Sequence, residues 1–318
     1  MPRRRLGVAL LLDPPLADEV DGLRRALGDR ALGRIPPHLT LVPPVNVAEG
    51  DLGAALGRVR DAAASLDGPL RLELGPPDSF LPANPVLYLR VAGEVDRLAR
   101  VRAAVFAGPL SRTEAWPWIP HVTLADEADP GRIGAALGVL DAYRSGFEAN
   151  RVVLLEERTT PTGRRWLPLA DAVFGPRHIV GRGGLELELT LGRLLDPEAA
   201  ALLRDLPEAR RAREGADESE GRAGAWAGVP PAGEEAGADL GEHRAPFPQL
   251  CVARRLEGVV GVGAAWWSGG RGYLGVAVDP AARRQGIGSQ ILARLTSALG
   301  DADGPGLETV GAAGFYRR

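Results

Sequence analysis

The sequence predicts an α+β protein in which a duplicated, two-lobed domain at residues 1–175 precedes a mixed α/β domain at residues 176–318. The first observation is a repeat: Pro37-His38-Leu39-Thr40-Leu41 returns as Pro120-His121-Val122-Thr123-Leu124, and a strand and a helix precede each copy. The second is a change of composition after Gly175-Pro176. The third is a series of three short strands that leads into a Gly-rich turn and a helix near the end of the chain.

Apolar runs and alternating patterns predict the strands of the first domain, and apolar residues three or four positions apart predict its helices. We expect Pro43-Pro44 to end the first His-x-Thr strand and Asp78–Pro85 to form a loop. The predicted elements are a strand at 6–12, a helix from Pro14, the first His-x-Thr strand, a helix at 48–64, strands at 70–74 and 86–91, a helix at 94–106, the second His-x-Thr strand, a helix at 132–142, and strands at 151–156 and 165–169. The order of strand, helix and His-x-Thr strand thus occurs twice, and a ligand site is expected between the lobes.

The second domain is predicted to begin with a strand at 185–191 and a charged helix at 197–213. Residues 214–248 are rich in Gly, Ala, Glu and Pro, and are expected to form a flexible segment. Strands follow at 250–255, 259–267 and 273–278, separated by short turns that suit hairpins, and a helix begins near Gly286.

The composition of the sequence excludes or disfavours several classes of protein. All 38 basic residues are arginine, there are 41 acidic residues, and the net charge of −3 does not favour wrapping of long nucleic acid. The single cysteine, Cys251, excludes an internal disulfide and lies in a sequence typical of a buried strand, where it is expected to be inert. The apolar run at 6–12 is too short for a signal peptide or a membrane span, so we expect a cytoplasmic protein.

The two His-x-Thr triplets carry the chemistry of the first domain. In a strand, His38 and Thr40 project from one face while Leu39 and Leu41 enter the core, and His121 and Thr123 behave alike. Side by side, such strands present two imidazoles and two hydroxyls. One imidazole can take a proton, the other can give one, and the threonines can stabilise charge on phosphoryl oxygens. Which histidine is the base stays open, and a lone strand histidine is more often structural. His178 and His243 lie in loop-like sequence.

Residues 5–175 resemble the 2H phosphoesterase superfamily, which includes 2′-5′ RNA ligase-like proteins and cyclic nucleotide phosphodiesterases. The resemblance rests on the paired triplets and on the flanking strands. It implies metal-independent hydrolysis or ligation at 2′,3′-cyclic or 2′-5′ phosphodiesters, with a small nucleotide or an RNA end as substrate. Trp116 and Trp118 can stack on a base or pack in the core. Arg158, Arg164 and Arg165 can contact phosphate or lie in a solvated loop.

The turn before the last predicted helix reads Arg283-Arg-Gln-Gly286-Ile-Gly288, and exposed N–H groups of such a turn can bind an anion. It resembles the pyrophosphate-binding segment of the GNAT N-acetyltransferases. The resemblance spans 183–318 and implies acetyl-CoA as acetyl donor, with no metal, and an amine as acceptor. The implied coenzyme-binding residues are Val276, Ala277, Val278, Arg283, Arg284, Gln285, Gly286, Ile287, Gly288 and Ser289.

Tyr316 matches the tyrosine that protonates the departing thiolate in that family. The family normally continues beyond the point where this sequence stops, so its last elements are expected to be missing or to come from a partner. The first hypothesis is therefore a bifunctional phosphodiesterase and N-acetyltransferase. The alternatives are a nucleotide- and acetyl-CoA-binding sensor with inactive domains, and an acetyltransferase whose first domain selects a nucleotide-like substrate.

Overall fold

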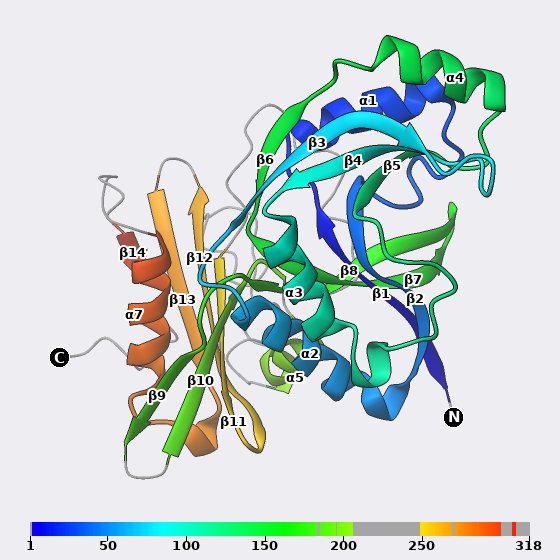
Figure 1. The fold of residues 1–318 in the computed structure, drawn as a ribbon. Coiled ribbons are helices and arrows are strands. Elements are labelled where there is room, and N and C mark those ends of the chain that lie inside the picture. The colour runs from blue at the N-terminus through cyan, green and yellow to red at the C-terminus, as the bar shows by residue number, and fades with distance from the viewer. Residues whose placement is uncertain are drawn as a thin grey trace. The chain divides into compact units, whose positions relative to one another are not determined.

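The computed structural model describes residues 2–182, 185–194, 196–205, 249–268, 271–299 and 307–309 (Figure 1). The chain forms two compact units. Unit 1 comprises residues 1–168 and 173–176, and unit 2 comprises residues 169–172 and 177–318. Each unit is described by itself. Within the described ranges, none of the helices combines the length and apolar character needed to span a membrane.

Unit 1 is built on one eight-stranded sheet with the order β6-β3-β4-β5-β2-β1-β7-β8. Its strands are β1 (Arg3–Leu11), β2 (His38–Ala48), β3 (Leu70–Ser79), β4 (Leu87–Gly93), β5 (His121–Ala125), β6 (Ser145–Ala149), β7 (Arg151–Thr160) and β8 (Gly163–Val173). Its α-helices are α1 (Leu16–Leu27), α2 (Leu52–Ala64), α3 (Val95–Val105) and α4 (Pro130–Val139).

The predicted duplication corresponds to two β-α-β segments, β1-α1-β2 and β4-α3-β5. In the sheet, β2 and β5 are neighbours, and β1 and β4 lie on their outer sides. The predicted strand at 6–12 is an inner strand, because β1 pairs with both β2 and β7. The two His-x-Thr strands therefore meet at the centre of the sheet.

The prediction that Pro43-Pro44 ends the first His-x-Thr strand is wrong, since β2 continues to Ala48. The β1–β2 register shifts here: Val8 faces Val42, whereas Leu6 faces Val45. Both prolines thus lie at an irregularity opposite Gly7. Proline has no N–H to donate to a ladder, and such a bulge accommodates it without breaking the strand.

Other parts of the fold also differ from the prediction. Asp78 and Ser79 belong to β3 rather than to a loop, because they pair with Tyr88 and Leu87 beyond a second irregularity that contains Pro76 and Pro77. The sequence did not predict β6, whose few apolar side chains give a weak alternating signal. His178 begins the strand β9 (His178–Arg182) instead of lying in a loop.

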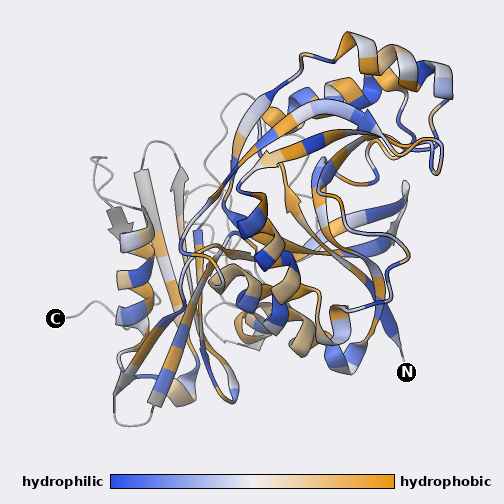
Figure 2. Ribbon diagram, viewed as in Figure 1, coloured by the Kyte–Doolittle hydropathy of each residue, from blue (hydrophilic) through white to orange (hydrophobic). Residues whose placement is uncertain are grey.

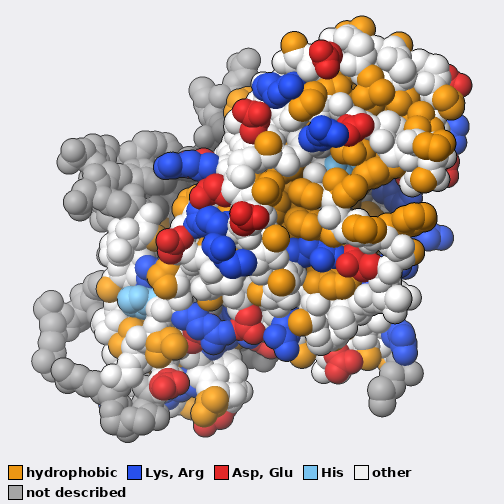
Figure 3. Space-filling view, viewed as in Figure 1, with side chains coloured by type: hydrophobic (Ala, Val, Ile, Leu, Met, Phe, Trp, Pro, Cys, Tyr) orange, Lys and Arg blue, Asp and Glu red, His pale blue; other side chains and the backbone are white. Residues whose placement is uncertain are grey.

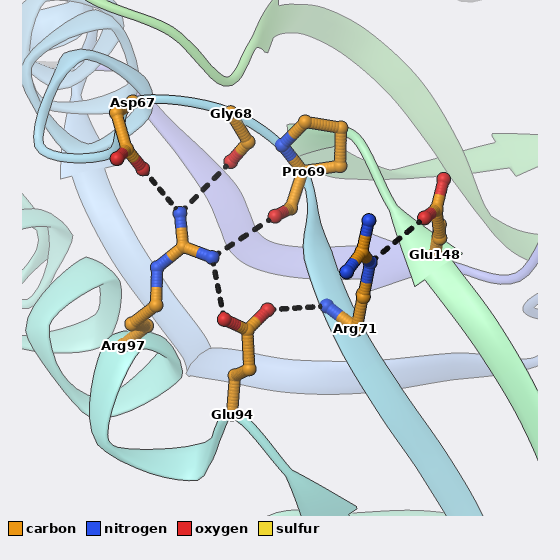
Figure 4. Close-up of polar contacts among 7 residues, drawn as sticks. All are labelled: Asp67, Gly68, Pro69, Arg71, Glu94, Arg97 and Glu148. Atoms are coloured by element: carbon orange, nitrogen blue, oxygen red, sulfur yellow. Dashed lines mark hydrogen bonds and ion pairs between the residues drawn. The ribbon is translucent and has the colours of Figure 1, made fainter.

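A cluster of charged residues ties α3 to β3 (Figure 4). Arg97 donates to Glu94 at 2.7 Å, to Asp67 at 2.5 Å and to the carbonyl oxygen of Pro69 at 3.2 Å. The backbone N–H of Arg71 donates to Glu94 at 2.7 Å. These hydrogen bonds lower the pKa of Glu94, the one from Arg71 most of all. The start of α3 is thereby held against the strand that carries Arg71.

Unit 2 contains a six-stranded sheet with the order β14-β13-β12-β11-β10-β9. Its elements after β9 are β10 (Leu185–Gly192), α5 (Pro197–Asp205), β11 (Gln249–Arg255), β12 (Gly258–Ser268), β13 (Arg271–Val278), α7 (Ile287–Leu299) and β14 (Leu307–Thr309). Hydrophobic and hydrophilic residues alternate along β10 (Figure 2), as the sequence predicts. The side chains of Ile287, Ile291 and Leu295 on α7 are buried against this sheet.

Glycines in β12 allow α7 to approach the sheet closely. A Cβ added at Gly263 would lie 2.2 Å from a side-chain carbon of Ile291 and 2.8 Å from one of Leu295. Gly261 is similarly crowded by Ile291 and Ile287. The helix that follows the Gly-rich turn is therefore fixed on the strands that precede that turn.

Candidate active site

The two His-x-Thr triplets lie beside each other on neighbouring antiparallel strands. Leu39 of β2 is the register partner of Val122 of β5, and both side chains are fully buried. By the antiparallel register, His38 then lies opposite Thr123, and Thr40 opposite His121. Because the side chains at i and i+2 share a face, the two imidazoles and two hydroxyls project from the same face of the sheet.

Each imidazole is oriented by a backbone carbonyl two residues upstream. Nδ1 of His38 lies 2.8 Å from the carbonyl oxygen of Pro36, and Nδ1 of His121 lies 2.8 Å from that of Ile119. A carbonyl oxygen can only accept, so Nδ1 of each ring carries the proton. In the neutral rings Nε2 therefore holds a lone pair, and it is the atom available for proton transfer.

Both imidazoles favour the neutral form. The pKa of His38 is lowered to about 4, mainly by burial and also by the charges of Arg24 and His121, while the hydrogen bond to the Pro36 carbonyl opposes the shift. Burial also lowers the pKa of His121, with the Ile119 carbonyl opposing. At neutral pH both rings are ready to accept a proton at Nε2.

On the β5 side, β4 contributes residues that the sequence did not single out. Arg90 is the register partner of His121, and Tyr88 is that of Thr123. Phe80 stacks on Tyr88 with ring centroids 4.3 Å apart. Both rings contact the His121 ring edge to face, at 5.1 and 5.2 Å. The only sequence signal was the alternation of Tyr88 and Arg90 in their strand, which shows a shared face but not which strand lies alongside.

A carboxylate joins the two β4 side chains. Asp78 accepts from Nε of Arg90 at 2.8 Å, and its interaction with the Tyr88 hydroxyl helps burial to raise the pKa of that phenol. On the β2 side the register partners are apolar and smaller, since Leu11 faces His38 and Ala9 faces Thr40. The surroundings of the two histidines are therefore chemically unequal, although the triplets are alike.

The two tryptophans before His121 differ in exposure. Nε1 of Trp118 donates to the backbone carbonyl of Thr40 at 3.0 Å, and Arg102 lies over its ring at 4.9 Å. The ring of Trp116 is 76% exposed. Trp118 thus has the packing role that the sequence left open, while Trp116 remains available to a ligand. Hydrophobic side chains gather on the side of unit 1 that Figure 3 shows.

The arginines of the β7–β8 hairpin, Arg158, Arg164 and Arg165, lie within strands rather than in a loop. Nε of Arg158 donates to Glu156 at 2.6 Å. Cys251 is fully buried in β11, as expected, and burial raises the pKa of its thiol to about 12. In the described ranges no group of three or more His, Cys, Asp or Glu side chains is placed to hold a metal ion.

In unit 2, the Gly-rich turn leads directly into α7. Arg284 and Gly286 have positive φ angles of 63° and 80°, so successive peptide groups turn sharply before the helix begins at Ile287. A Cβ at Gly286 would meet nothing within 4 Å. Arg283, Arg284 and Gln285 are exposed. The first N–H groups of a helix have no partner inside it, so a turn of this kind can bind an anion.

The strand before the turn pairs along one edge more than along the other. Val276, Ala277 and Val278 of β13 pair with β12. On the opposite edge, β14 pairs only with Gly272–Leu274 among the described residues. Tyr316, His243 and the segment 214–248 lie outside the residues that the structure describes.

Comparison with known proteins identifies both parts. The sequence model of the 2′-5′ RNA ligase superfamily matches residues 12–161, and that of a GNAT acetyltransferase domain matches residues 246–318. "Putative phosphoesterase BH1439" of Halalkalibacterium halodurans is 31% identical over 151 residues, which is 47% of this chain and 86% of that protein. A "Putative phosphoesterase" of Bacillus pumilus is 29% identical over 144 residues, 45% of this chain and 82% of that protein.

Among solved structures, TT0787 of Thermus thermophilus aligns with a TM-score of 0.41 at 19% identity, covering 55% of this chain and 100% of the other. E. coli LigT complexed with 3′-AMP aligns with a TM-score of 0.37 at 16% identity, covering 54% and 99%. The chain belongs to the 2′-5′ RNA ligase superfamily of phosphoesterases through its N-terminal part, and it carries a GNAT acetyltransferase domain in its C-terminal part.

Proposed function

We propose that unit 1 is a metal-independent phosphodiesterase for 2′,3′-cyclic or 2′-5′ phosphodiesters, and that His38, Thr40, His121 and Thr123 are its catalytic residues. The observation that supports this most strongly is the matched placement of the two imidazoles. In each ring Nδ1–H donates to a backbone carbonyl two residues upstream, which leaves Nε2 for proton transfer.

In hydrolysis of a cyclic phosphate, Nε2 of one histidine takes a proton from water while the water oxygen bonds to phosphorus. The bond from phosphorus to one ribose oxygen breaks, and Nε2–H of the other histidine protonates that oxygen. The hydroxyls of Thr40 and Thr123 donate to the non-bridging oxygens as negative charge increases. In the reverse direction a ribose hydroxyl replaces water and the two histidines exchange roles.

The test is turnover of a panel of 2′,3′-cyclic nucleotides and 2′-5′ dinucleotides in EDTA. We expect His38→Ala and His121→Ala each to lower kcat by at least about 100-fold. Thr40→Val is expected to lower kcat by roughly 100-fold, with recovery in Thr40→Ser. His178→Ala, in unit 2, is the matched control. Turnover that survives both active-site histidine changes would exclude this assignment.

For unit 2 we propose binding of acetyl-CoA and N-acetyl transfer to an amine. When bound, the coenzyme supplies the acetyl thioester. The N–H groups of Gly286–Ser289 and the side chains of Arg283, Arg284 and Gln285 would hold its pyrophosphate. The β13 backbone at Val276–Val278 would hold its pantetheine arm, on the edge where β14 pairing is limited to earlier residues.

A further inference from the structure

We propose that unit 1 has a second phosphate-binding subsite, formed by Arg5 and Arg34 around Glu157. Its ligand would be a phosphate group of a nucleotide strand whose end is processed at the histidines. The inference rests on the proposed phosphodiesterase function and narrows its substrate class, since a mononucleotide cannot occupy both positions.

One buried carboxylate holds the two guanidinium groups together. Nε of Arg5 lies 3.3 Å from Oε2 of Glu157, and Nη2 of Arg34 lies 2.9 Å from Oε1. The Glu157 side chain is only 8% exposed, whereas those of Arg5 and Arg34 are 47% and 50% exposed. The carboxylate is thus covered, while N–H groups of both arginines face solvent.

The charges of this cluster do not balance. Two guanidinium groups share one carboxylate, which leaves one positive charge, and each guanidinium has N–H donors beyond the one that contacts Glu157. A phosphodiester carries a single negative charge and accepts such hydrogen bonds in a planar, often bidentate geometry. It would neutralise the cluster without displacing Glu157.

The cluster lies on the same face of the sheet as the catalytic residues. Gly7 pairs with Leu155 and Leu6 pairs with Glu156. The next step of this register puts Arg5 opposite Glu157, in agreement with their ion pair. Ala9, two residues the other way, pairs with Thr40. Side chains at i, i+2 and i+4 share a face, so Arg5 and Ala9 flank Gly7 on the face of Thr40 and His38.

Trp166 supports this placement. A Cβ added at Gly7 would lie 3.4 Å from the Trp166 ring, so the ring covers Gly7 on that face. The backbone N–H of Trp166 donates to the carbonyl of Arg34 at 2.8 Å. Arg34 is therefore held next to the same row of residues, in the segment that leads to His38.

Distance along β1 sets the length of the ligand. Four residues separate Arg5 from Ala9, which corresponds to about 13 Å in an extended strand. A nucleic acid strand has one phosphate per nucleotide, so the subsite fits a phosphate roughly two nucleotides from the reacting one. We infer that the substrate is a short oligonucleotide end.

The test compares a trinucleotide ending in a 2′,3′-cyclic phosphate with the corresponding mononucleotide. Arg5→Gln and Arg34→Gln should each raise the ratio of the trinucleotide KM to the mononucleotide KM about tenfold. The dependence of log KM on log salt should weaken by about one for the trinucleotide. Arg4→Gln is the matched control, because Arg4 binds Glu156 on the opposite face. Its ratio should stay at the wild-type value.

The subsite is overturned if the ratio of the two KM values is unchanged in both Arg5→Gln and Arg34→Gln. It is also overturned if Arg4→Gln changes this ratio as much as they do. Arg34 lies in the segment that leads to His38, so a change there also affects how that segment is held. Arg5 lies in β1, so Arg5→Gln tests the subsite without this effect. Absence of wild-type turnover on either substrate would count against the proposed function. The subsite is then tested by fluorescence anisotropy with the labelled trinucleotide. Weaker binding in Arg5→Gln and Arg34→Gln than in Arg4→Gln supports it, and equal binding overturns it.

Discussion

A proline directly precedes each histidine, and this local sequence accounts for the geometry of the imidazoles. A residue before proline favours extended backbone, and Pro36 and Ile119 both occupy that position. Each carbonyl then reaches Nδ1 of the histidine two residues on. The Pro-His-x-Thr sequence thus encodes the tautomer as well as the position of the ring.

At the residue scale, the lowered pKa values predict an acidic optimum for the phosphodiesterase. The base must be neutral and the acid protonated. As the pH drops below the pKa of His38, about 4, the neutral fraction of the base decreases. As the pH rises above the pKa of His121, which lies below the usual 6.5, the protonated fraction of the acid decreases. We therefore expect a bell-shaped profile of kcat/KM with its maximum between about pH 4 and 6.5. A profile measured from pH 3.5 to 9 with a maximum above pH 7 would contradict this.

The sequence predicts the four His and Thr residues because their signal is local. Phe80, Tyr88 and Arg90 were not predicted, since their contact with His121 depends on the pairing of β4 with β5. The spacing of residues in a single sequence does not indicate which distant strands pair or in which register. The same limit applies to Arg5 and Glu157, which lie more than 150 residues apart.

At the scale of elements, a buried ion pair fixes the connection between α1 and β2. Nε of Arg24 lies 2.8 Å from Asp29, and Nη1 donates to Asp21 at 2.7 Å and to the carbonyl of Ile35 at 3.0 Å. Arg24 is only 3% exposed. The end of the helix thereby holds the segment that presents His38.

Arg24→Met should therefore both destabilise unit 1 and raise the pKa of His38. Loss of one partner of a buried pair costs about 3–5 kcal/mol. Because the charge of Arg24 contributes to the lowered pKa of His38, its removal should raise that pKa and move the acid limb of the pH profile upward. Chemical denaturation and NMR titration measure the two effects.

Asp21→Asn is the matched control for Arg24→Met, since its partly exposed side chain should contribute less than about 1 kcal/mol. An Arg24→Met protein with wild-type stability would refute the structural role of the pair. A His38 titration that does not move would refute the electrostatic one.

Most helices and strands of unit 1 were predictable, because their hydrophobic periodicity persists over several residues. The errors fall where periodicity is interrupted: at Pro43-Pro44, at Pro76-Pro77 and in the short strand β6. At both proline pairs the strand is preserved by an irregular register with its neighbour. Only tertiary pairing compensates there for the missing N–H groups.

At the scale of the whole molecule, the two units have separate cores, and each contains one of the two proposed sites. The core of unit 2 includes Leu187, Cys251 and Ile291, all within its own sheet and α7. The proposed catalytic residues of unit 1 lie on β2 and β5, and the proposed coenzyme residues lie on β13, the Gly-rich turn and α7. Each site is built entirely from elements of its own unit, so a change in one should leave the other active.

Gly286→Glu tests this independence. At a φ of 80° a glutamate adds backbone strain of roughly 1–2 kcal/mol, and its carboxylate repels an anion at the helix N-terminus. Calorimetry should show loss of acetyl-CoA binding while cyclic-phosphate turnover stays at the wild-type rate. Gly286→Asn separates the two causes, because asparagine tolerates this conformation without adding charge and should retain part of the binding. His121→Ala should give the reverse pattern. If Gly286→Glu binds acetyl-CoA normally, the coenzyme site lies elsewhere. If a folded variant loses both activities, the two sites are coupled.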